Sequence, residues 1–157
     1  MADSNDSKVS IRRATKADFD VLHDLTLAFT KYSADASGSP EEFYYEGWEE
    51  GFKEEINESL EDEDSYFFIA YVDDSPAGYI LCRYCDSCFK FEIDELYVDS
   101  EYRSLGIGKK LMEQAVETGK KYKAPITLEV YEWNKDAHGF YSNYGFSSDG
   151  SILKLKI

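Results

Sequence analysis

The chain has 157 residues, of which 43% are hydrophobic, and this suits one globular domain over 1–157 with a sizeable core. Its 32 acidic and 17 basic side chains give a net charge of −15, which argues against nucleic acid as a partner. No apolar run is long enough to cross a membrane and the start of the chain is polar, so we expect a cytoplasmic protein with no membrane partner and a flexible segment at 1–8.

The first half of the chain alternates between strand-like and helix-like segments. Thr15 and Asp18 have the spacing of a capping box, which predicts the start of a helix, and the stretch Ser37-Gly38-Ser39-Pro40 ends it. Asp73-Asp74-Ser75-Pro76 is typical of a hairpin turn. Besides that helix, the expected elements are strands at 9–13, 66–72 and 77–84 and a helix at about 42–60. Such an order is typical of an α/β domain.

Much of the negative charge lies in one segment. Residues 41–64 hold twelve acidic side chains and one lysine, a net −11, whereas the remainder of the chain carries only −4. One interpretation is a solvated helix face followed by a charged turn. The other is an acidic rim that attracts a cationic amine and raises its rate of association.

The next strand, expected at about 90–98, contains a change of phase. Phe91 and Ile93 are apolar at odd positions, whereas Leu96 and Val98 are apolar at even ones. A strict two-residue alternation must therefore absorb one extra residue between them. This predicts a β-bulge near Asp94–Glu95, and bulges are common beside functional sites.

A glycine-containing loop follows that strand. Arg103-Ser104-Leu105-Gly106-Ile107-Gly108 leads into a helix whose apolar residues recur at roughly helical spacing. The first N–H groups of a helix have no internal partner and lie at the positive end of its dipole, so they can hold a phosphate. A dinucleotide fingerprint would need glycine where Leu111 stands, and a Walker loop would need Ser or Thr where Lys110 stands. Neither of those motifs fits.

Three motifs in order now indicate a family. The Arg-x-x-Gly-x-Gly loop at 103–108 is followed by the strand Leu128-Glu129-Val130, and then by Asn-x-x-Ala-x-x-Phe-Tyr-x-x-x-Gly-Phe at 134–146. This string resembles the GCN5-related N-acetyltransferases, the GNAT superfamily. The resemblance implies an α/β fold with a mixed, partly parallel sheet of six to seven strands and about four helices. It also implies that the sheet is splayed between its fourth and fifth strands.

The same resemblance implies how coenzyme A would be held. Backbone amides of the 104–109 loop would bind its pyrophosphate, and the pantetheine arm would lie along the strand that ends at 98, where a backbone N–H polarises the thioester carbonyl. Asn134 corresponds to an asparagine that hydrogen-bonds the cofactor in this family. The implied cofactor-binding residues are Leu96, Tyr97, Val98, Arg103, Ser104, Leu105, Gly106, Ile107, Gly108, Lys109, Asn134 and Tyr141.

Catalytic roles also follow from the resemblance. Tyr141 matches the tyrosine near the thioester sulfur, where it would protonate the departing thiolate. Glu129 has the spacing of a glutamate that acts as general base in one branch of the family, and Glu92 matches a second family position. A chain of water molecules without a dominant base is the third option.

The motif Cys82-x-x-Cys85-x-x-Cys88 lacks the fourth ligand of a closed zinc site or of an iron–sulfur cluster, so we expect no metal. An odd number of cysteines in such a chain predicts free thiols.

The resemblance therefore implies an acetyl-CoA-dependent N-acetyltransferase that acts by direct attack of an amine in a ternary complex. Its acceptor is a primary amine, either a small cationic molecule such as a polyamine or a protein amino group. The alternative is a non-catalytic sensor that binds acyl-CoA. The sequence leaves open whether an exposed strand edge pairs two copies of the chain into a homodimer.

Overall fold

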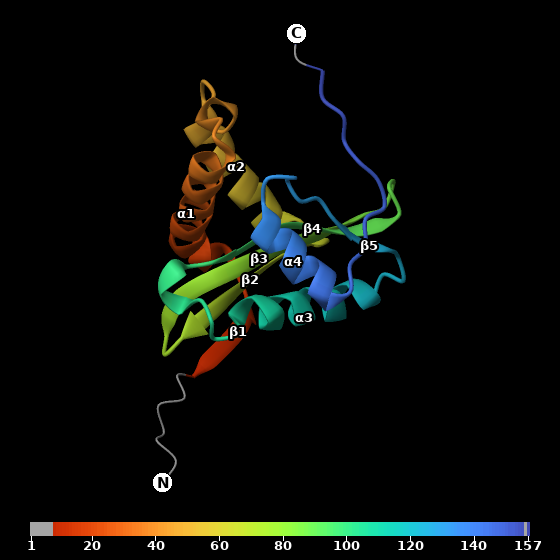
Figure 1. Cartoon of the computed structure of the whole chain (residues 1–157). Helices are drawn as coiled ribbons and strands as arrows, with labels where there is room; N and C mark the ends of the chain where they lie inside the picture. The colour runs from red at the N-terminus through yellow and green to blue at the C-terminus, as the bar shows by residue number, and fades with distance from the viewer. Residues whose placement is uncertain (1–7, 156) are drawn as a thin grey trace.

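The computed structural model describes residues 8–155 and 157, so the segment expected to be flexible, 1–8, lies outside the described residues except for Lys8. A five-stranded sheet with the order β1-β2-β3-β4-β5 forms its centre (Figure 1). The first four strands are antiparallel, and β5 runs parallel to β4. The strands are β1 (Val9–Arg13), β2 (Ser65–Val72), β3 (Ser75–Cys85), β4 (Lys90–Val98) and β5 (Ile126–Leu128).

Helices cover both faces of this sheet (Figure 1). They are α1 (Phe19–Ser37), α2 (Trp48–Glu61), α3 (Ile107–Lys120) and α4 (Lys135–Tyr144). The α1 and α2 helices pack on one face, and α3 packs on the other with α4 beside it. None of the described helices has the length and apolar character needed to span a membrane.

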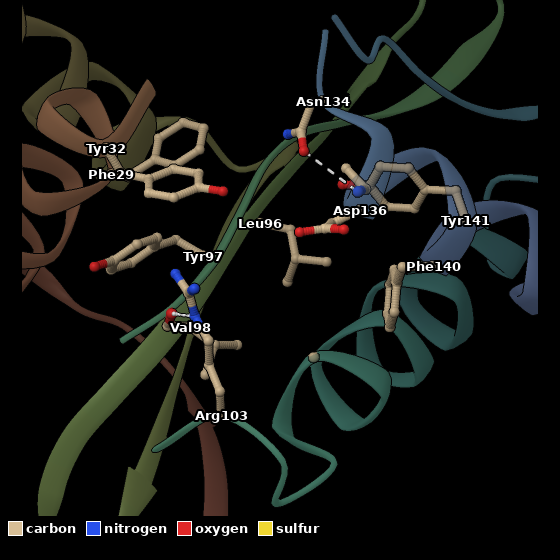
Figure 2. Close-up of a pocket in the computed structure, with 12 residues that line it drawn as sticks. Phe29, Tyr32, Leu96, Tyr97, Val98, Arg103, Asn134, Asp136, Phe140 and Tyr141 are labelled. Carbon is tan, nitrogen blue, oxygen red and sulfur yellow. Dashed lines mark hydrogen bonds between the residues drawn. The ribbon is translucent and has the colours of Figure 1, made fainter. Parts of the chain in front are cut away.

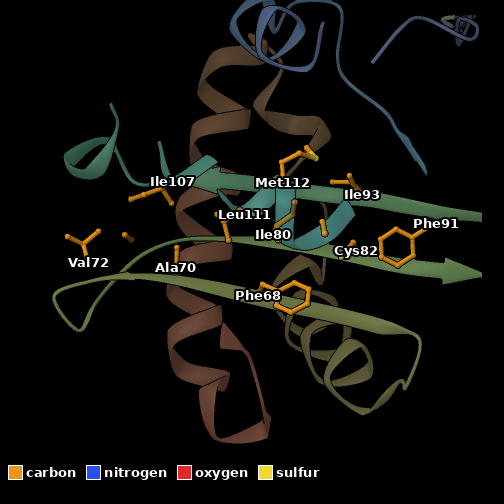
Figure 3. Packing of buried hydrophobic residues seen from close by; sticks show 12 residues of the cluster. Phe68, Ala70, Val72, Ile80, Cys82, Phe91, Ile93, Ile107, Leu111 and Met112 are labelled. Carbon is orange, nitrogen blue, oxygen red and sulfur yellow. The ribbon is translucent and has the colours of Figure 1, made fainter. Parts of the chain in front are cut away.

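The alternation of β2 explains why the sheet has a core on each face. Phe68 and Ala70 belong to the cluster under α3, together with Leu111 and Met112 (Figure 3). Phe67 and Ile69, at the positions between them, belong to the cluster under α1 and α2. Successive side chains of a strand point to opposite faces, and both faces of this strand are apolar because both are covered.

The predicted bulge in β4 is confirmed. Leu81 of β3 pairs with Glu95, and the next residue, Cys82, pairs with Ile93, so Asp94 is the extra residue. Close approach at the other end of this ladder depends on Gly78, where an added Cβ would lie 2.4 Å from the carbonyl oxygen of Tyr97.

The sheet opens between β4 and β5. The two strands pair only over Phe91, Glu92 and Ile93 of β4, and β4 continues to Val98 beyond the end of β5. This agrees with the splay that we expected. The expected number of six to seven strands is wrong, because the sheet has five strands in the part of the chain that the structure describes. Leu153 and Leu155 in the tail are 93% and 85% exposed, and no described neighbour covers them as a sheet would.

Two further expectations need correction. The second helix begins at Trp48 rather than near 42, because Gly47 adopts a left-handed φ of 80° and separates α2 from a short 3₁₀ helix at Pro40–Glu42. The cysteines are not all free thiols, because Cys85 and Cys88 form a disulfide while Cys82 is free and buried. The hairpin turn between β3 and β4 brings these two sulfur atoms together, which strand alternation alone could not indicate.

Asp18 anchors the start of α1. Its carboxylate accepts two hydrogen bonds from Arg12, at 2.6 and 2.8 Å, and one from the Thr15 backbone at 2.8 Å, as the capping box predicted. These bonds lower the pKa of Asp18 to about 2. We expect Asp18→Asn to reduce the free energy of unfolding at pH 7 by about 1 to 2 kcal/mol, discounted because Arg12 is half exposed.

The pH dependence provides a check of that assignment. A lowered pKa contributes stability that is present above the unfolded value of 3.8 and is lost as the pH falls through about 2. In urea titrations the wild type and Asp18→Asn should therefore differ at pH 7 and converge near pH 2. A constant difference at both pH values would contradict this role for Asp18.

Candidate functional site

A cavity of about 300 Å³ lies where the sheet opens (Figure 2). Its walls come from β4, α1, α4 and the start of α3. Seven of the predicted cofactor-binding residues line it: Leu96, Tyr97, Val98, Arg103, Gly108, Asn134 and Tyr141. Phe29, Tyr32, Asp136, Ala137 and Phe140 line it as well, and they are not among the predicted cofactor-binding residues. Phe29 carries no signal in the sequence beyond being an apolar residue of the helix α1.

The glycine-containing loop borders this cavity. Ser104 and Gly106 both have a φ of 73°, and the first hydrogen bond of α3 runs from the Lys110 N–H to the Gly106 carbonyl. The N–H groups of residues 107–109 therefore precede the first helical bond and lie at the positive end of the dipole. The Ile107 side chain is buried in the core, so this residue could contribute only its backbone to a ligand.

Arg103 is fixed beside the end of β4. Its Nε donates a hydrogen bond to the Val98 carbonyl at 3.3 Å, and its guanidinium lies 5.4 Å from the ring centre of Tyr32 (Figure 2). Both contacts keep a positive charge at the mouth of the cavity. This charge and the helix dipole of α3 would together favour an anionic group.

The α4 helix contributes two predicted residues. The side-chain oxygen of Asn134 accepts a hydrogen bond from the Ala137 N–H at 3.3 Å and so caps the helix (Figure 2). The Tyr141 ring packs against Phe140 and Phe146, with centroid distances of 5.5 and 6.0 Å. Burial raises the pKa of Tyr141, so its hydroxyl keeps its proton at neutral pH and can act as a donor.

The two predicted carboxylates do not line this cavity. Glu92 is held by Lys90 at 2.6 Å and by Arg83 at 3.6 Å. Glu129 follows the end of β5 and is exposed. Each lies near the opening between β4 and β5 without forming part of its wall.

A carboxylate outside the predicted set stands beside the cavity residues in β4, although its own side chain is not part of the cavity wall. Glu95 immediately precedes the cavity residue Leu96, and the Tyr79 hydroxyl donates a hydrogen bond to it at 3.2 Å. Burial raises the pKa of Glu95 to about 7, and the charges of Asp94 and Glu55 add to this effect. The phase change in β4 indicated a bulge here, but the alternation could not show that this side chain is half-buried against Tyr79.

Several known proteins are similar to this chain, among them the following three. An uncharacterised N-acetyltransferase of Methanocaldococcus jannaschii is 36% identical over 54% of this chain and 40% of its own length. The peptidyl-lysine N-acetyltransferase YjaB of Salmonella typhimurium is 32% identical over 63% of each protein. The chain therefore matches less than two thirds of either relative.

The third protein is a solved structure. It is AAC(6')-Iy in complex with the bisubstrate analogue CoA-S-monomethyl-acetylneamine, with a TM-score of 0.74, 16% identity and coverage of 96% of this chain and 99% of that chain. Identity this low supports the fold alone. The model of the acetyltransferase (GNAT) family matches residues 34–146, which include the loop, β5 and the motif that ends at Phe146. The chain belongs to the acetyltransferase (GNAT) family.

Proposed function

We propose that the chain is an N-acetyltransferase that transfers the acetyl group of acetyl-CoA to a primary amine in a ternary complex. One observation carries the proposal. The cavity brings the end of β4, the N-terminus of α3 and Tyr141 together where the sheet opens. This arrangement supplies an anion site, an unpaired strand and a proton donor within one cleft.

The residues around the cavity fit coenzyme A in two respects. Amides of residues 104–109 and the Arg103 guanidinium suit the charge of its diphosphate. Beyond Ile93, β4 has no β5 partner, so its backbone can pair with the amide groups of the pantetheine arm. Acetyl-CoA itself supplies the activated acetyl group and a thiolate leaving group.

Tyr141 is the residue that we assign to the leaving thiolate. A phenol with a pKa of about 10 would give its proton to a thiolate whose conjugate acid has a pKa of about 8.5, an uphill step of about 2 kcal/mol. The raised pKa of Tyr141 makes this step larger, and it also ensures that the proton is present. General acids of this kind contribute roughly 100-fold or more to the rate.

Glu95 is the residue that we assign to the proton of the amine. An amine with a pKa of about 10.4 is neutral in about one molecule in 2,500 at pH 7, which is equivalent to roughly 4.6 kcal/mol. A carboxylate with a pKa of about 7 is a stronger base than an exposed one and is still substantially ionised at neutral pH. Glu92 and Glu129, the predicted bases, remain as comparison residues, since ion pairs already hold Glu92.

The acceptor is a cationic primary amine. Support comes from the carboxylates that gather on the α2 side of β4, where the charges of Asp94 and Glu55 add to the burial that raises the pKa of Glu95. The printed names of the similar proteins, a peptidyl-lysine N-acetyltransferase and a protein bound to an acetylneamine analogue, point to amines as well. A polyamine-like molecule or a protein amino group would match this surface.

Binding and turnover test the proposal separately. We expect acetyl-CoA at 100 times its dissociation constant to stabilise the protein by about 2.7 kcal/mol, seen as a higher melting temperature. We also expect release of coenzyme A, followed by chromatography, when a panel of polyamines and lysine peptides is supplied. Binding without release for every amine would favour the alternative, an acyl-CoA sensor. Absence of both signals would refute the cofactor site.

A further inference from the structure

A disulfide closes the hairpin turn between β3 and β4. Cys85, the last residue of β3, is bonded to Cys88, and their Cα atoms are 5.2 Å apart. Cys88 is exposed, as are the two residues between the cysteines, and Cys85 is half-buried. The Cys88 N–H donates a hydrogen bond to the Cys85 sulfur at 3.2 Å. The proposed acetyl transfer uses neither sulfur.

The third cysteine has the opposite character. Cys82 is fully buried in the core under α3, and burial raises the pKa of its thiol to about 12. A thiol must ionise before it can attack a disulfide, so Cys82 is inert in the folded protein. The described part of the chain therefore contains one buried, unreactive thiol and one accessible disulfide.

We propose that Cys85 and Cys88 form a reversible thiol–disulfide exchange site for small-molecule thiols of the glutathione class. A thiolate attacks the more exposed Cys88 sulfur, the bond between the two cysteines breaks, and its electron pair goes to Cys85. The Cys88 N–H is already placed to stabilise the new Cys85 thiolate. A second thiolate then attacks the mixed disulfide and releases Cys88. Two small thiols become one disulfide and the protein gains two thiols, and the reverse reaction uses the oxidised small molecule.

This turn joins the two strands that hold the carboxylates on the α2 side. Cys85 pairs with Lys90, whose Nζ lies 2.6 Å from Glu92, and Arg83 lies 3.1 Å from Asp94. Reduction breaks the disulfide that closes the turn at the end of the β3–β4 ladder, and the turn can then open locally. We expect amide hydrogen exchange to increase at residues 84–92 and to stay unchanged at 96–98, beyond the bulge.

Thiol counting at defined ratios of reduced to oxidised glutathione tests the proposal. The native protein is equilibrated at each glutathione ratio and alkylated with N-ethylmaleimide, and its mass is then measured by mass spectrometry. We expect no label with oxidised glutathione, two labels with reduced glutathione and a graded transition between them. A third label should appear only after unfolding in guanidinium. Resistance to reduced glutathione in the native protein, or two labels at every ratio, would overturn the proposal.

Single variants test the order of attack. Cys85→Ser should accumulate a glutathione adduct at Cys88, because the Cys85 thiol that would displace the glutathione is missing. Cys88→Ser should form its adduct at least several-fold more slowly, because Cys85 is less exposed. Cys82→Ala is the matched control and should exchange as the wild type does. Peptide mapping of the labelled wild type assigns the same sites if a variant does not fold. Equal adduct rates in both serine variants would contradict the assigned order, and labels at Cys82 would contradict the site.

Discussion

Replacing Glu95 with glutamine is expected to lower kcat by roughly 100-fold to 1,000-fold, which is the usual contribution of a general base. Glutamine keeps the size of the side chain and can still accept the hydrogen bond from Tyr79, so packing should change little. The measurement is steady-state acetyl transfer to an amine from the active panel, with the dissociation constant of acetyl-CoA measured in parallel. That constant should stay within about twofold of the wild type, because cofactor binding does not need the carboxylate charge.

The same substitution should stabilise the protein at alkaline pH. The pKa of Glu95 rises from 4.5 to about 7 on folding. As the pH rises through this window the unfolded chain releases a proton that the folded chain retains, so the wild type loses stability. Glutamine does not titrate, and Glu95→Gln should exceed the wild type by at most about 3 kcal/mol at pH 8 and match it below pH 4. Chemical denaturation at the two pH values measures this.

Two comparison variants make the assignment of the base specific. Glu92→Gln and Glu129→Gln change the predicted carboxylates, of which Glu92 is held by ion pairs and Glu129 is exposed. We expect each to reduce kcat less than tenfold. In the wild type, kcat/KM should also rise with pH through an apparent pKa of about 7, and that step should be missing in Glu95→Gln. A tenfold larger loss in Glu129→Gln than in Glu95→Gln would transfer the role to Glu129.

Local patterns predicted the parts of this fold that depend on neighbours in sequence. The change of phase between Ile93 and Leu96 located the bulge, and Thr15 with Asp18 located the short 3₁₀ helix Lys16–Asp18 that leads into α1, because both signals act over a few residues. The strand count depended instead on whether residues after Phe146 find a partner, which sequence alternation does not determine. The tail is apolar at Leu153 and Leu155, yet both side chains are exposed.

The candidate site likewise contains residues that the sequence predicted and residues that it did not. Seven predicted residues line one cavity because the motifs that contain them occupy fixed positions on β4, α3 and α4. Glu95 was missed because its environment comes from Tyr79, sixteen residues earlier, and from Glu55 on α2. Its burial is a property of how two helices cover β4, and a single segment of sequence carries no sign of it. The disulfide at Cys85 similarly depends on the shape of a turn.

Tyr141→Phe should separate chemistry from binding. Phenylalanine preserves the ring that packs against Phe140 and Phe146 and removes only the hydroxyl that would protonate the thiolate. We expect kcat to fall by about 100-fold to 1,000-fold, while the dissociation constant of acetyl-CoA changes less than twofold. Stopped-flow measurement of coenzyme A release in a single turnover would place the loss in the chemical step.

The neighbouring Tyr144 provides a matched control on the same helix. It is half-buried, packs against Phe146 at 6.0 Å and does not line the cavity. Tyr144→Phe should therefore retain wild-type turnover, with melting temperatures for both variants close to that of the wild type. The leaving group offers a further check, because a thiol with a lower pKa needs less protonation. An acetyl thioester of a more acidic thiol should recover part of the loss in Tyr141→Phe, and a loss that is independent of the leaving group would mean that Tyr141 positions the substrate rather than supplying the proton.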